Sequence, residues 1–328
     1  MELLLYILLL IVGFVGLIKG ADLFVDGSSA LARTFHVPGL IIGLTIVAMG
    51  TSFPELAVST SAAISGSNEI ALSNVLGSNI FNLLVVLGFC ALFRTIPVEK
   101  NILRRDFPVC LVVAVVMLLV TCTDTLLSGK FFNMPVTADA GDVPRWFGLA
   151  LLAAFVLYIL VLIIDAKKHP RQEEENEGKP MAVWKSFLLI LIGAGLIVAG
   201  GEAVVRSAKY IAMAAGMTET LVGLTIVAMG TSLPELVTSI VAARKGEVEM
   251  AVGNAVGSCI FNAMLIIGVS SAIHPFAVNT ASLFDMIIQI VVVVVTLLFS
   301  ATGKGITRGK GFLMLCMYAA DMVFAVMR

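Results

Sequence analysis

One stretch of this sequence occurs twice. Residues 43–56 read GLTIVAMGTSFPEL and residues 223–236 read GLTIVAMGTSLPEL, so the two copies differ at a single position. Each copy places a glutamate, two hydroxyls, a glycine and a proline inside a run that is otherwise hydrophobic enough to cross a bilayer. An ionised group at that depth costs about 3 kcal/mol on insertion scales. The two acids, Glu55 and Glu235, are therefore expected to have a function.

The composition indicates an integral membrane protein. Hydrophobic residues make up 59% of the 328 residues and charged residues 13%, whereas a soluble domain carries about 25% charge. The net charge of −1 gives no attraction to nucleic acid. The five cysteines show no CxxC spacing, so they are expected to be packing residues rather than disulfides or zinc ligands.

The apolar windows predict an all-α polytopic membrane protein, with ten spans by the criterion of about 20 residues per span. The first span is expected to be retained rather than removed as a signal peptide, because no basic region or cleavage site accompanies it. The spans fall near residues 3–21, 39–65, 70–93, 107–123, 146–166, 184–204, 219–243, 248–273, 284–301 and 310–327.

The lysines and arginines predict the orientation. With the N-terminus outside, the cytoplasmic loops hold fifteen of them and the outer loops hold five. This bias places both termini outside and the charged linker in the cytoplasm. Each half has five spans, an odd number, so the second half must enter the membrane from the opposite side. The sequence therefore predicts two inverted five-helix repeats, residues 1–166 and 184–328, joined by a cytoplasmic linker at 167–183.

Each repeated block is expected to interrupt its own helix. Pro54 cannot donate a hydrogen bond to the carbonyl of Gly50, and its ring clashes with that carbonyl. The same holds for Pro234 in the second half. The backbone carbonyls near Ala48 and Ala228 would then be free to point into a cavity, the one place where irregular backbone is tolerated at membrane depth.

A second block of the repeat follows at the same offset, since residues 73–82 read SNVLGSNIFN and residues 253–262 read GNAVGSCIFN. Residues four apart share a helical face, so Asn74, Ser78 and Asn82 are expected to form a polar row. Gly77 and Gly257 are expected to allow close packing against the broken helix.

The polar groups of both blocks are expected to meet near the midplane, where the interrupted helices of inverted repeats converge in secondary transporters. All are oxygen donors, and a hard cation such as Ca²⁺ takes six to eight oxygens with carboxylates among them. Two carboxylates would be neutralised by one Ca²⁺ or two Na⁺. The candidate side chains are Glu55, Glu235, Thr51, Ser52, Ser78, Asn82, Thr231, Ser232, Ser258 and Asn262.

This charge balance suggests a mechanism. An empty site with two ionised carboxylates is costly to close off from water, whereas a cation-filled site is not. Only loaded states would then cross between outward-open and inward-open forms, which gives obligatory exchange rather than leak.

At these residues the sequence resembles the calcium/cation antiporter superfamily, and in size and layout the prokaryotic sodium/calcium exchangers. The resemblance implies a central calcium site built from Glu55 and Glu235 with carbonyls near Thr51 and Thr231. It implies that the first and sixth spans slide across the core. It also implies flanking sodium sites, completed by the two asparagines, that use Ala48, Ser52, Ser78, Ala228, Ser232, Ser258, Asn82 and Asn262. Some relatives carry an aspartate where this chain has an asparagine, so the cluster here has two acids rather than three.

Other interpretations remain open. A lone intramembrane acid can be structural, and the serines and asparagines can be interhelical hydrogen-bond partners worth about 0.6 kcal/mol each. A cation channel would explain the carboxylates, although an inverted repeat suits alternating access better. An intramembrane hydrolase would need a base beside Ser52 or Ser232, and no His or Lys lies near either in the sequence. An antiporter of Ca²⁺, or another divalent cation, and H⁺ is the alternative within the transporter class.

The sequence thus predicts a transporter of Ca²⁺ and Na⁺, with H⁺ as the alternative coupling ion, and neither enzymatic activity nor a cofactor. The expected location is the cytoplasmic (inner) membrane, which the chain crosses several times. The lipid bilayer is the expected partner, with no nucleic acid and no obligatory protein partner.

Overall fold

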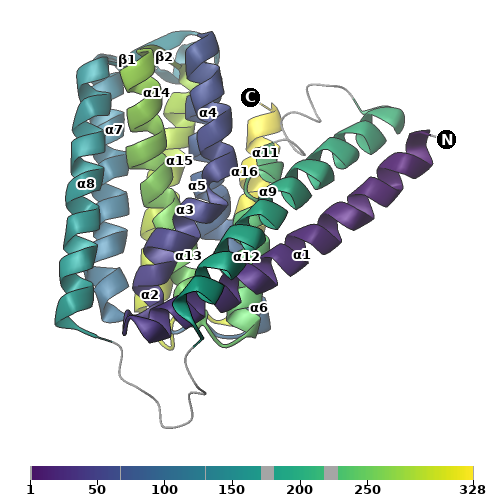
Figure 1. Ribbon diagram of the computed structural model, residues 1–328. Helices are drawn as coiled ribbons and strands as arrows, with labels where there is room; N and C mark the ends of the chain where they lie inside the picture. The colour runs from purple at the N-terminus through teal and green to yellow at the C-terminus, as the bar shows by residue number, and fades with distance from the viewer. Residues whose placement is uncertain (1, 67, 130, 171–180, 218–227, 328) are drawn as a thin grey trace.

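The computed structural model describes residues 2–66, 68–129, 131–170, 181–217 and 228–327. These residues form a helical bundle with a long, tilted helix pair on one side (Figure 1). The predicted all-α membrane fold is confirmed, since eight described helices are long and apolar enough to cross a bilayer and one bent pair forms a ninth span.

The first half contains five spans within its described residues. Their helices are α1 (Glu2–Thr34); the bent span of α2 (Gly39–Ile42), η1 (Gly43–Val47), α3 (Ala48–Thr51) and α4 (Phe53–Ser65); α5 (Asn68–Phe81), η2 (Asn82–Val86) and α6 (Leu87–Phe93); η3 (Ile102–Asp106) and α7 (Phe107–Ser128); and α8 (Arg145–Lys168). A short 3₁₀ turn, η4 (Phe131–Asn133), and strand β1 (Asp139–Val143) lie between α7 and α8.

The second half repeats this order. Its described elements are α9 (Val183–Ala214); α11 (Ala228–Gly230) and α12 (Leu233–Arg244); α13 (Val248–Ile260), η6 (Phe261–Ile266) and α14 (Ile267–Ile273); strand β2 (Phe276–Asn279); α15 (Thr280–Ala301); and α16 (Arg308–Met327). The predicted span near 219–243 starts within residues 218–227, which lie outside the described part. Most of the predicted linker at 167–183 also lies outside the described part.

The central spans of the two halves run in opposite directions. The span α5–α6 ends at the face that carries residues 94–101, 168–170 and 302–307, which we call the linker face (Figure 1). The span α13–α14 starts at that same face and ends at the opposite one, which carries β1 and β2 and which we call the sheet face. The predicted inversion of the repeat is therefore present in the fold.

A two-stranded antiparallel sheet, which the sequence did not predict, ties the halves together at the sheet face. Strand β1 pairs with β2, with Val143 opposite Phe276. The linker face has the matching contact, because Ile96 and Ile306 form an isolated antiparallel bridge. Phe276 lies 180 residues after Ile96, so the two residues correspond in the repeat. The two pairings are therefore related by the inversion.

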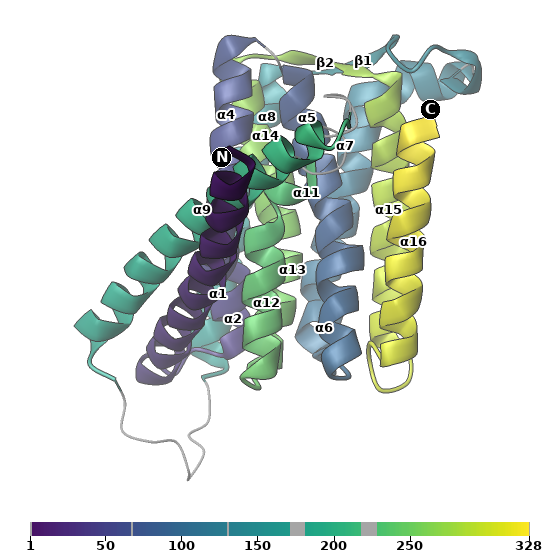
Figure 2. The same cartoon turned by 90° about the vertical axis from the view of Figure 1, so that its right-hand side faces the viewer.

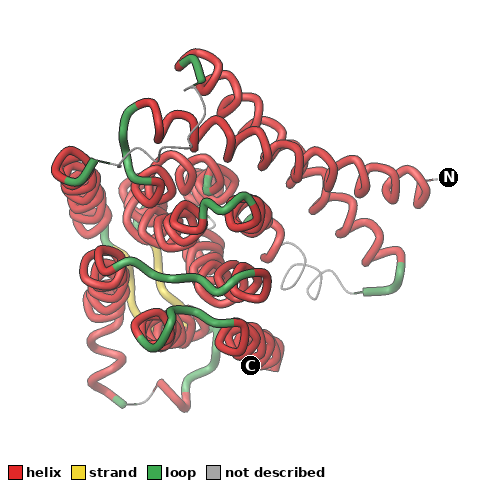
Figure 3. The backbone as a smooth tube through the Cα atoms, turned by 90° about the horizontal axis from the view of Figure 1, so that it is seen from below, coloured by secondary structure: helices red, strands yellow, loops and turns green. Residues whose placement is uncertain are grey.

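Helices α1 and α9 pack against each other and cross the bundle diagonally (Figure 2), and seen along the bundle axis the N-terminal helix extends well beyond the other spans (Figure 3). Glycines make this contact close. A Cβ atom at Gly200 would lie 2.6 Å from the backbone nitrogen of Leu17, and one at Gly193 would lie 2.6 Å from that of Phe24. The two helix backbones touch directly, as small residues allow in membranes.

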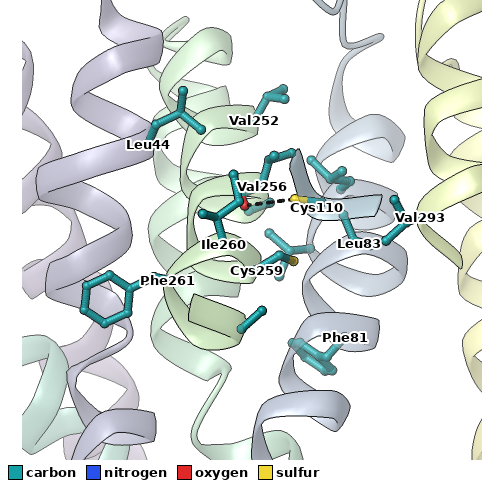
Figure 4. Close-up of a cluster of buried hydrophobic side chains, with 14 of the residues drawn as sticks. Leu44, Phe81, Leu83, Cys110, Val252, Val256, Cys259, Ile260, Phe261 and Val293 are labelled. Carbon is teal, nitrogen blue, oxygen red and sulfur yellow. Dashed lines mark hydrogen bonds between the residues drawn. The ribbon is translucent and has the colours of Figure 1, made fainter. Parts of the chain in front are cut away.

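The spans α5–α6 and α13–α14 form the buried centre of the bundle. Apolar side chains of η1, α5, α7, α13 and α15 interdigitate there (Figure 4), and the thiol of Cys110 approaches the carbonyl of Val256 at 3.9 Å. Gly257 meets Leu44 as expected, since a Cβ there would lie 2.8 Å from the Leu44 Cα. No described atom lies within 4 Å of a Cβ built at Gly77.

Candidate functional site

The two repeated blocks break their helices at corresponding serines. The segments Gly39–Thr51 and Phe53–Ser65 meet at an angle of 50°. The break falls at Ser52, whose backbone leaves the helical region (φ −85°, ψ 8°), and Ser232 has nearly the same conformation (φ −91°, ψ 5°). A proline in the first turn then starts each following helix, α4 and α12, and the glutamate follows it. The predicted interruption is confirmed.

One detail of this interruption differs from the expectation. The carbonyl of Ala48 is not free, because it accepts a hydrogen bond from the Ser52 backbone nitrogen at 3.0 Å, and the Thr51 hydroxyl oxygen lies 3.3 Å from it. The proline removes only its own donor, and the serine two residues earlier still closes the last turn of α3. Ala228 begins the short helix α11, next to the residues that are not described.

The serine of each half binds the glutamate of the other half. The Ser52 hydroxyl donates to Glu235 Oε1 at 2.8 Å, and the Ser232 hydroxyl donates to Glu55 Oε1 at 3.0 Å. Ser78 also donates to Glu55 Oε1, at 3.4 Å, and lies 2.9 Å from the Ser232 hydroxyl. All five side chains are buried. The predicted convergence of both acids on one polar cluster between the halves is therefore observed.

A second pair of reciprocal contacts supports this arrangement. The Thr51 hydroxyl donates to Asn254 Oδ1 at 3.0 Å, and the Thr231 hydroxyl donates to Asn74 Oδ1 at 3.3 Å. Each threonine thus reaches across to the asparagine of the opposite repeat. The contact joins the broken helix of one half to the central helix of the other.

Each of these asparagines is held in turn by its own half. Asn254 Nδ2 donates to the Ser239 hydroxyl at 2.9 Å and to the Glu235 carbonyl at 3.4 Å. Asn74 Nδ2 donates to the Ser59 hydroxyl at 3.1 Å and to the carbonyl of Glu55 at 3.5 Å. The sequence analysis did not name Asn254, Ser59 or Ser239 among the site residues, although the same 180-residue offset relates each pair.

Several buried polar atoms in this cluster have no hydrogen-bond partner among the described residues. Within that part of the chain, Glu55 and Glu235 each use Oε1 and leave Oε2 without a hydrogen bond, although both side chains are fully buried. Unsatisfied polar groups of this kind are rare in folded proteins and call for an explanation. A bound cation would satisfy them, since every oxygen among them is a ligand type that hard cations accept. The other unpartnered atoms of the predicted site are Ser258 Oγ, Asn82 Oδ1 and Nδ2, and Asn262 Oδ1.

The two predicted asparagines lie at corresponding irregularities. Asn82 begins the π-helical segment η2, and Asn262 is the second residue of the π-helical segment η6. Single π-turns inside α-helices occur frequently at functional sites. Neither asparagine has a hydrogen bond to a glutamate in the described structure; Asn262 Nδ2 instead donates to Asn79 Oδ1 at 3.2 Å. Sequence reasoning had not singled out Asn79.

The electrostatics of the cluster favour a positive ligand. Within the described residues no lysine or arginine forms an ion pair with Glu55 or Glu235. An ionised carboxylate without a partner is costly in a low-dielectric interior. The described part of the chain also has no group of three or more His, Cys, Asp or Glu side chains arranged for a metal. The two carboxylates and the neighbouring hydroxyls and amides supply oxygen ligands of the type that hard cations accept.

Two inverted helical repeats that meet at a shared pair of buried carboxylates define a membrane transporter of the inverted-repeat class. The family model described as "Sodium/calcium exchanger protein" matches residues 5–164 and 185–327. The chain belongs to this sodium/calcium exchanger family, whose members are membrane ion exchangers and not enzymes. The family resemblance carried by the repeated blocks is confirmed.

Similar proteins cover most of the chain. The inner membrane protein YrbG of Escherichia coli is 37% identical over an alignment of 280 positions, which covers 81% of this chain and 79% of YrbG. The sodium/calcium exchanger MaX1 of Methanosarcina acetivorans is 32% identical over an alignment of 339 positions including gaps, which covers 96% of this chain and 97% of MaX1. A solved structure of the sodium-calcium exchanger NCX_Mj, soaked with Na⁺ and without Ca²⁺, matches with a TM-score of 0.81 at 30% identity, covering 98% of this chain and 99% of NCX_Mj.

Proposed function

We propose that this protein exchanges Ca²⁺ for Na⁺ across the cytoplasmic membrane by alternating access, with the cation bound between Glu55 and Glu235. One observation carries the proposal: each glutamate is held through Oε1 by the serine of the opposite repeat and keeps a buried Oε2 that no described residue hydrogen-bonds. Those two oxygens belong to different halves, so a cation that binds both would link the repeats.

The proposed calcium ligands are the Glu55 and Glu235 carboxylates with the backbone near Thr51 and Thr231. The flanking sodium positions would be formed by Ala48, Ser52, Ser78, Ala228, Ser232 and Ser258, and Asn82 and Asn262 would complete the cluster around the cations. The Ala48 carbonyl already accepts the hydrogen bond of the Ser52 backbone nitrogen, so it would bind Na⁺ through its second lone pair or give up that bond. Similarity to exchangers named for sodium and calcium supports this choice of ions.

In the proposed cycle, α1 and α9 slide as one pair across the core, as the family resemblance implies. Their mutual glycine contacts support movement as a unit, because the two backbones are in direct contact. The pair is held to the core near the linker face by Lys245, whose Nζ donates to Asp26 Oδ1 at 2.7 Å and to the Asp22 carbonyl at 3.0 Å. This polar contact can break and re-form at low cost, as exposed ion pairs do.

The proposed orientation has both termini outside and the linker face in the cytoplasm, with the five-helix repeats at residues 1–166 and 184–328 and a linker at 167–183. The distribution of lysine and arginine supports it. Helix α8 ends at Lys168 and α9 begins at Val183, near the proposed bounds of the linker.

The decisive experiment is ⁴⁵Ca²⁺ uptake into proteoliposomes that contain the full chain. Vesicles loaded with Na⁺ and diluted into choline buffer should accumulate ⁴⁵Ca²⁺, and vesicles with equal Na⁺ on both sides should not. A pH gradient without Na⁺ tests the alternative of Ca²⁺/H⁺ exchange. Uptake driven only by the pH gradient would replace Na⁺ by H⁺ as the coupling ion, and uptake in neither condition would refute calcium antiport.

A further inference from the structure

Asn79 occupies the buried contact between the repeats, three residues before Asn82 on α5. Its side chain is fully buried. Its Oδ1 accepts a hydrogen bond from Asn262 Nδ2 at 3.2 Å, and its backbone carbonyl accepts one from the Cys259 thiol at 3.6 Å. Asn79 therefore contacts the second repeat twice, at a predicted site residue and at the residue next to Ser258.

In the structure, the contact turns the NH₂ side of the Asn262 amide toward Asn79 and its oxygen away from Asn79. An amide is planar, with its oxygen and its NH₂ group on opposite sides of the same carbon. Because the NH₂ group of Asn262 donates to Asn79, its Oδ1 points elsewhere, and no described residue donates to Oδ1 although the side chain is fully buried. A carbonyl oxygen attracts a cation, whereas an NH₂ group would repel it.

The other repeat lacks this arrangement. The residue that corresponds to Asn79 by the 180-residue offset is Cys259, which offers no amide oxygen. In agreement, Asn82, the counterpart of Asn262, has neither Oδ1 nor Nδ2 hydrogen-bonded within the described structure, although it too is fully buried. The two asparagines therefore differ in the one contact that would orient them.

We propose that Asn79 is a positioning residue that holds the Asn262 amide with its carbonyl oxygen toward the bound cation, whereas the Asn82 amide is free to turn either way. This inference rests on the proposed function, in which both asparagines line the cation site. It makes the site functionally asymmetric despite the near-identity of the repeated blocks. The asymmetry originates in a residue that does not touch the ion.

Substitutions at position 79 separate this role from simple packing. Aspartate can only accept, so in the Asn79→Asp variant the NH₂ group of Asn262 keeps its partner and its orientation. Leucine has a similar size and can neither accept nor donate, so in the Asn79→Leu variant the Asn262 amide is released. The Cys259→Asn variant supplies the missing amide oxygen to Asn82. The Thr296→Val variant, which removes a buried unpartnered hydroxyl of α15, is the matched control.

The test is calorimetric titration of the purified full-length protein and these variants with CaCl₂, accompanied by KM and maximal rate from ⁴⁵Ca²⁺ flux. In Asn79→Leu the Kd and the KM for Ca²⁺ are expected to rise about three- to tenfold, which corresponds to the free energy of one hydrogen bond. The maximal rate is expected to change less. Asn79→Asp is expected to bind at least as tightly as the wild type. Cys259→Asn is expected to lower Kd, and Thr296→Val to leave it unchanged.

Wild-type affinity in Asn79→Leu, or weakened binding in Asn79→Asp, would overturn the positioning role while leaving the proposed function standing. Failure of the wild type to bind or carry Ca²⁺ would instead refute the proposed function. If Asn79→Leu does not elute as a folded, monodisperse protein, Cys259→Asn decides, and an unchanged Kd in that variant would overturn the inference.

Discussion

The hydroxyl of Ser52 donates a hydrogen bond to Glu235 Oε1 across the boundary between the two repeats, at 2.8 Å. The inverse contact, from Ser232 to Glu55, is 3.0 Å long. Each half of the molecule therefore holds the acid of the other half in place. A change in the relative position of the halves must change both contacts together, which couples the shape of the cluster to the conformation of the whole protein.

These reciprocal contacts predict matched effects of serine substitution. Ser52→Ala and Ser232→Ala should each weaken Ca²⁺ binding about tenfold, because a hydrogen bond to a charged group contributes about 1.5 kcal/mol or more. Calorimetric titration measures the effect, with Ser300→Ala as the control at a buried serine of α15. A large effect in one variant and none in the other would contradict the equivalence of the two contacts.

The two carboxylates predict that Ca²⁺ binding requires both negative charges. In Glu55→Gln and Glu235→Gln the site keeps its shape but retains one negative charge, so Ca²⁺ would be bound without full neutralisation. Removing one member of a buried charged set costs about 3 kcal/mol or more, which corresponds to about 100-fold in affinity. Uptake of ⁴⁵Ca²⁺ at the wild-type rate by either variant would show that the charge is not needed.

The hydrogen bonds of Asn254 and Asn74 predict that substitution of either residue lowers the stability of the protein rather than selectively weakening Ca²⁺ binding. Asn254→Ala removes three buried hydrogen bonds, one each to Thr51, Ser239 and the Glu235 carbonyl. The free energy of unfolding should fall by about 2 kcal/mol. The midpoint of thermal unfolding in detergent reports this change, and Asn74→Ala should lower it comparably. An unchanged midpoint in both variants would contradict the structural role assigned here.

The backbone contact between α1 and α9 predicts a steric effect at one glycine and none at another. A Cβ at Gly200 would lie 2.6 Å from the Leu17 nitrogen, whereas one at Gly195, on the same helix, has no described atom within 4 Å. Gly200→Ala should therefore destabilise the protein by about 1–3 kcal/mol and slow transport. Gly195→Ala should leave thermal unfolding and ⁴⁵Ca²⁺ uptake unchanged; equal effects of both variants would refute the contact.

The raised pKa of Glu99, which lies at the linker face, predicts that the stability of the protein depends on pH. Burial, followed by the hydrogen bond and negative charge of Glu249, raises the pKa of Glu99 from 4.5 to about 7. Between these two pH values the folded protein holds a proton that the unfolded chain has released, so the free energy of unfolding falls as the pH rises across this window. Above about pH 7 the contribution no longer changes.

The measurement is thermal unfolding of the wild type and Glu99→Gln at a series of pH values from about 5 to 8. The variant should lose the part of the slope below pH 7, because glutamine does not titrate. Identical pH profiles in the two proteins would show that Glu99 is not the titrating group.

The sequence by itself determined the class of the protein and the location of its unusual chemistry. The apolar windows predicted most of the described spans to within about five residues, because a bilayer requires about 20 apolar residues per helix. They were wrong at the ends of α1 and α9, which continue past the predicted ends at 21 and 204 to Thr34 and Ala214. The repeated acids Glu55 and Glu235 identified the polar cluster, because an ionised residue inside an apolar helix has a high energetic cost, and it recurs in both halves. The odd number of spans per half predicted the inversion without any structure.

Only the tertiary structure decided which groups pair within that cluster. A repeated motif does not state whether Ser52 binds Glu55 of its own half or Glu235 of the other, since both arrangements have the same pattern. It also gave no reason to expect a bonded carbonyl at Ala48, or the contact of Asn79 with Asn262. These depend on how two helices from opposite halves approach each other, and in a bilayer that approach is set by packing and hydrogen bonds between residues far apart in the chain.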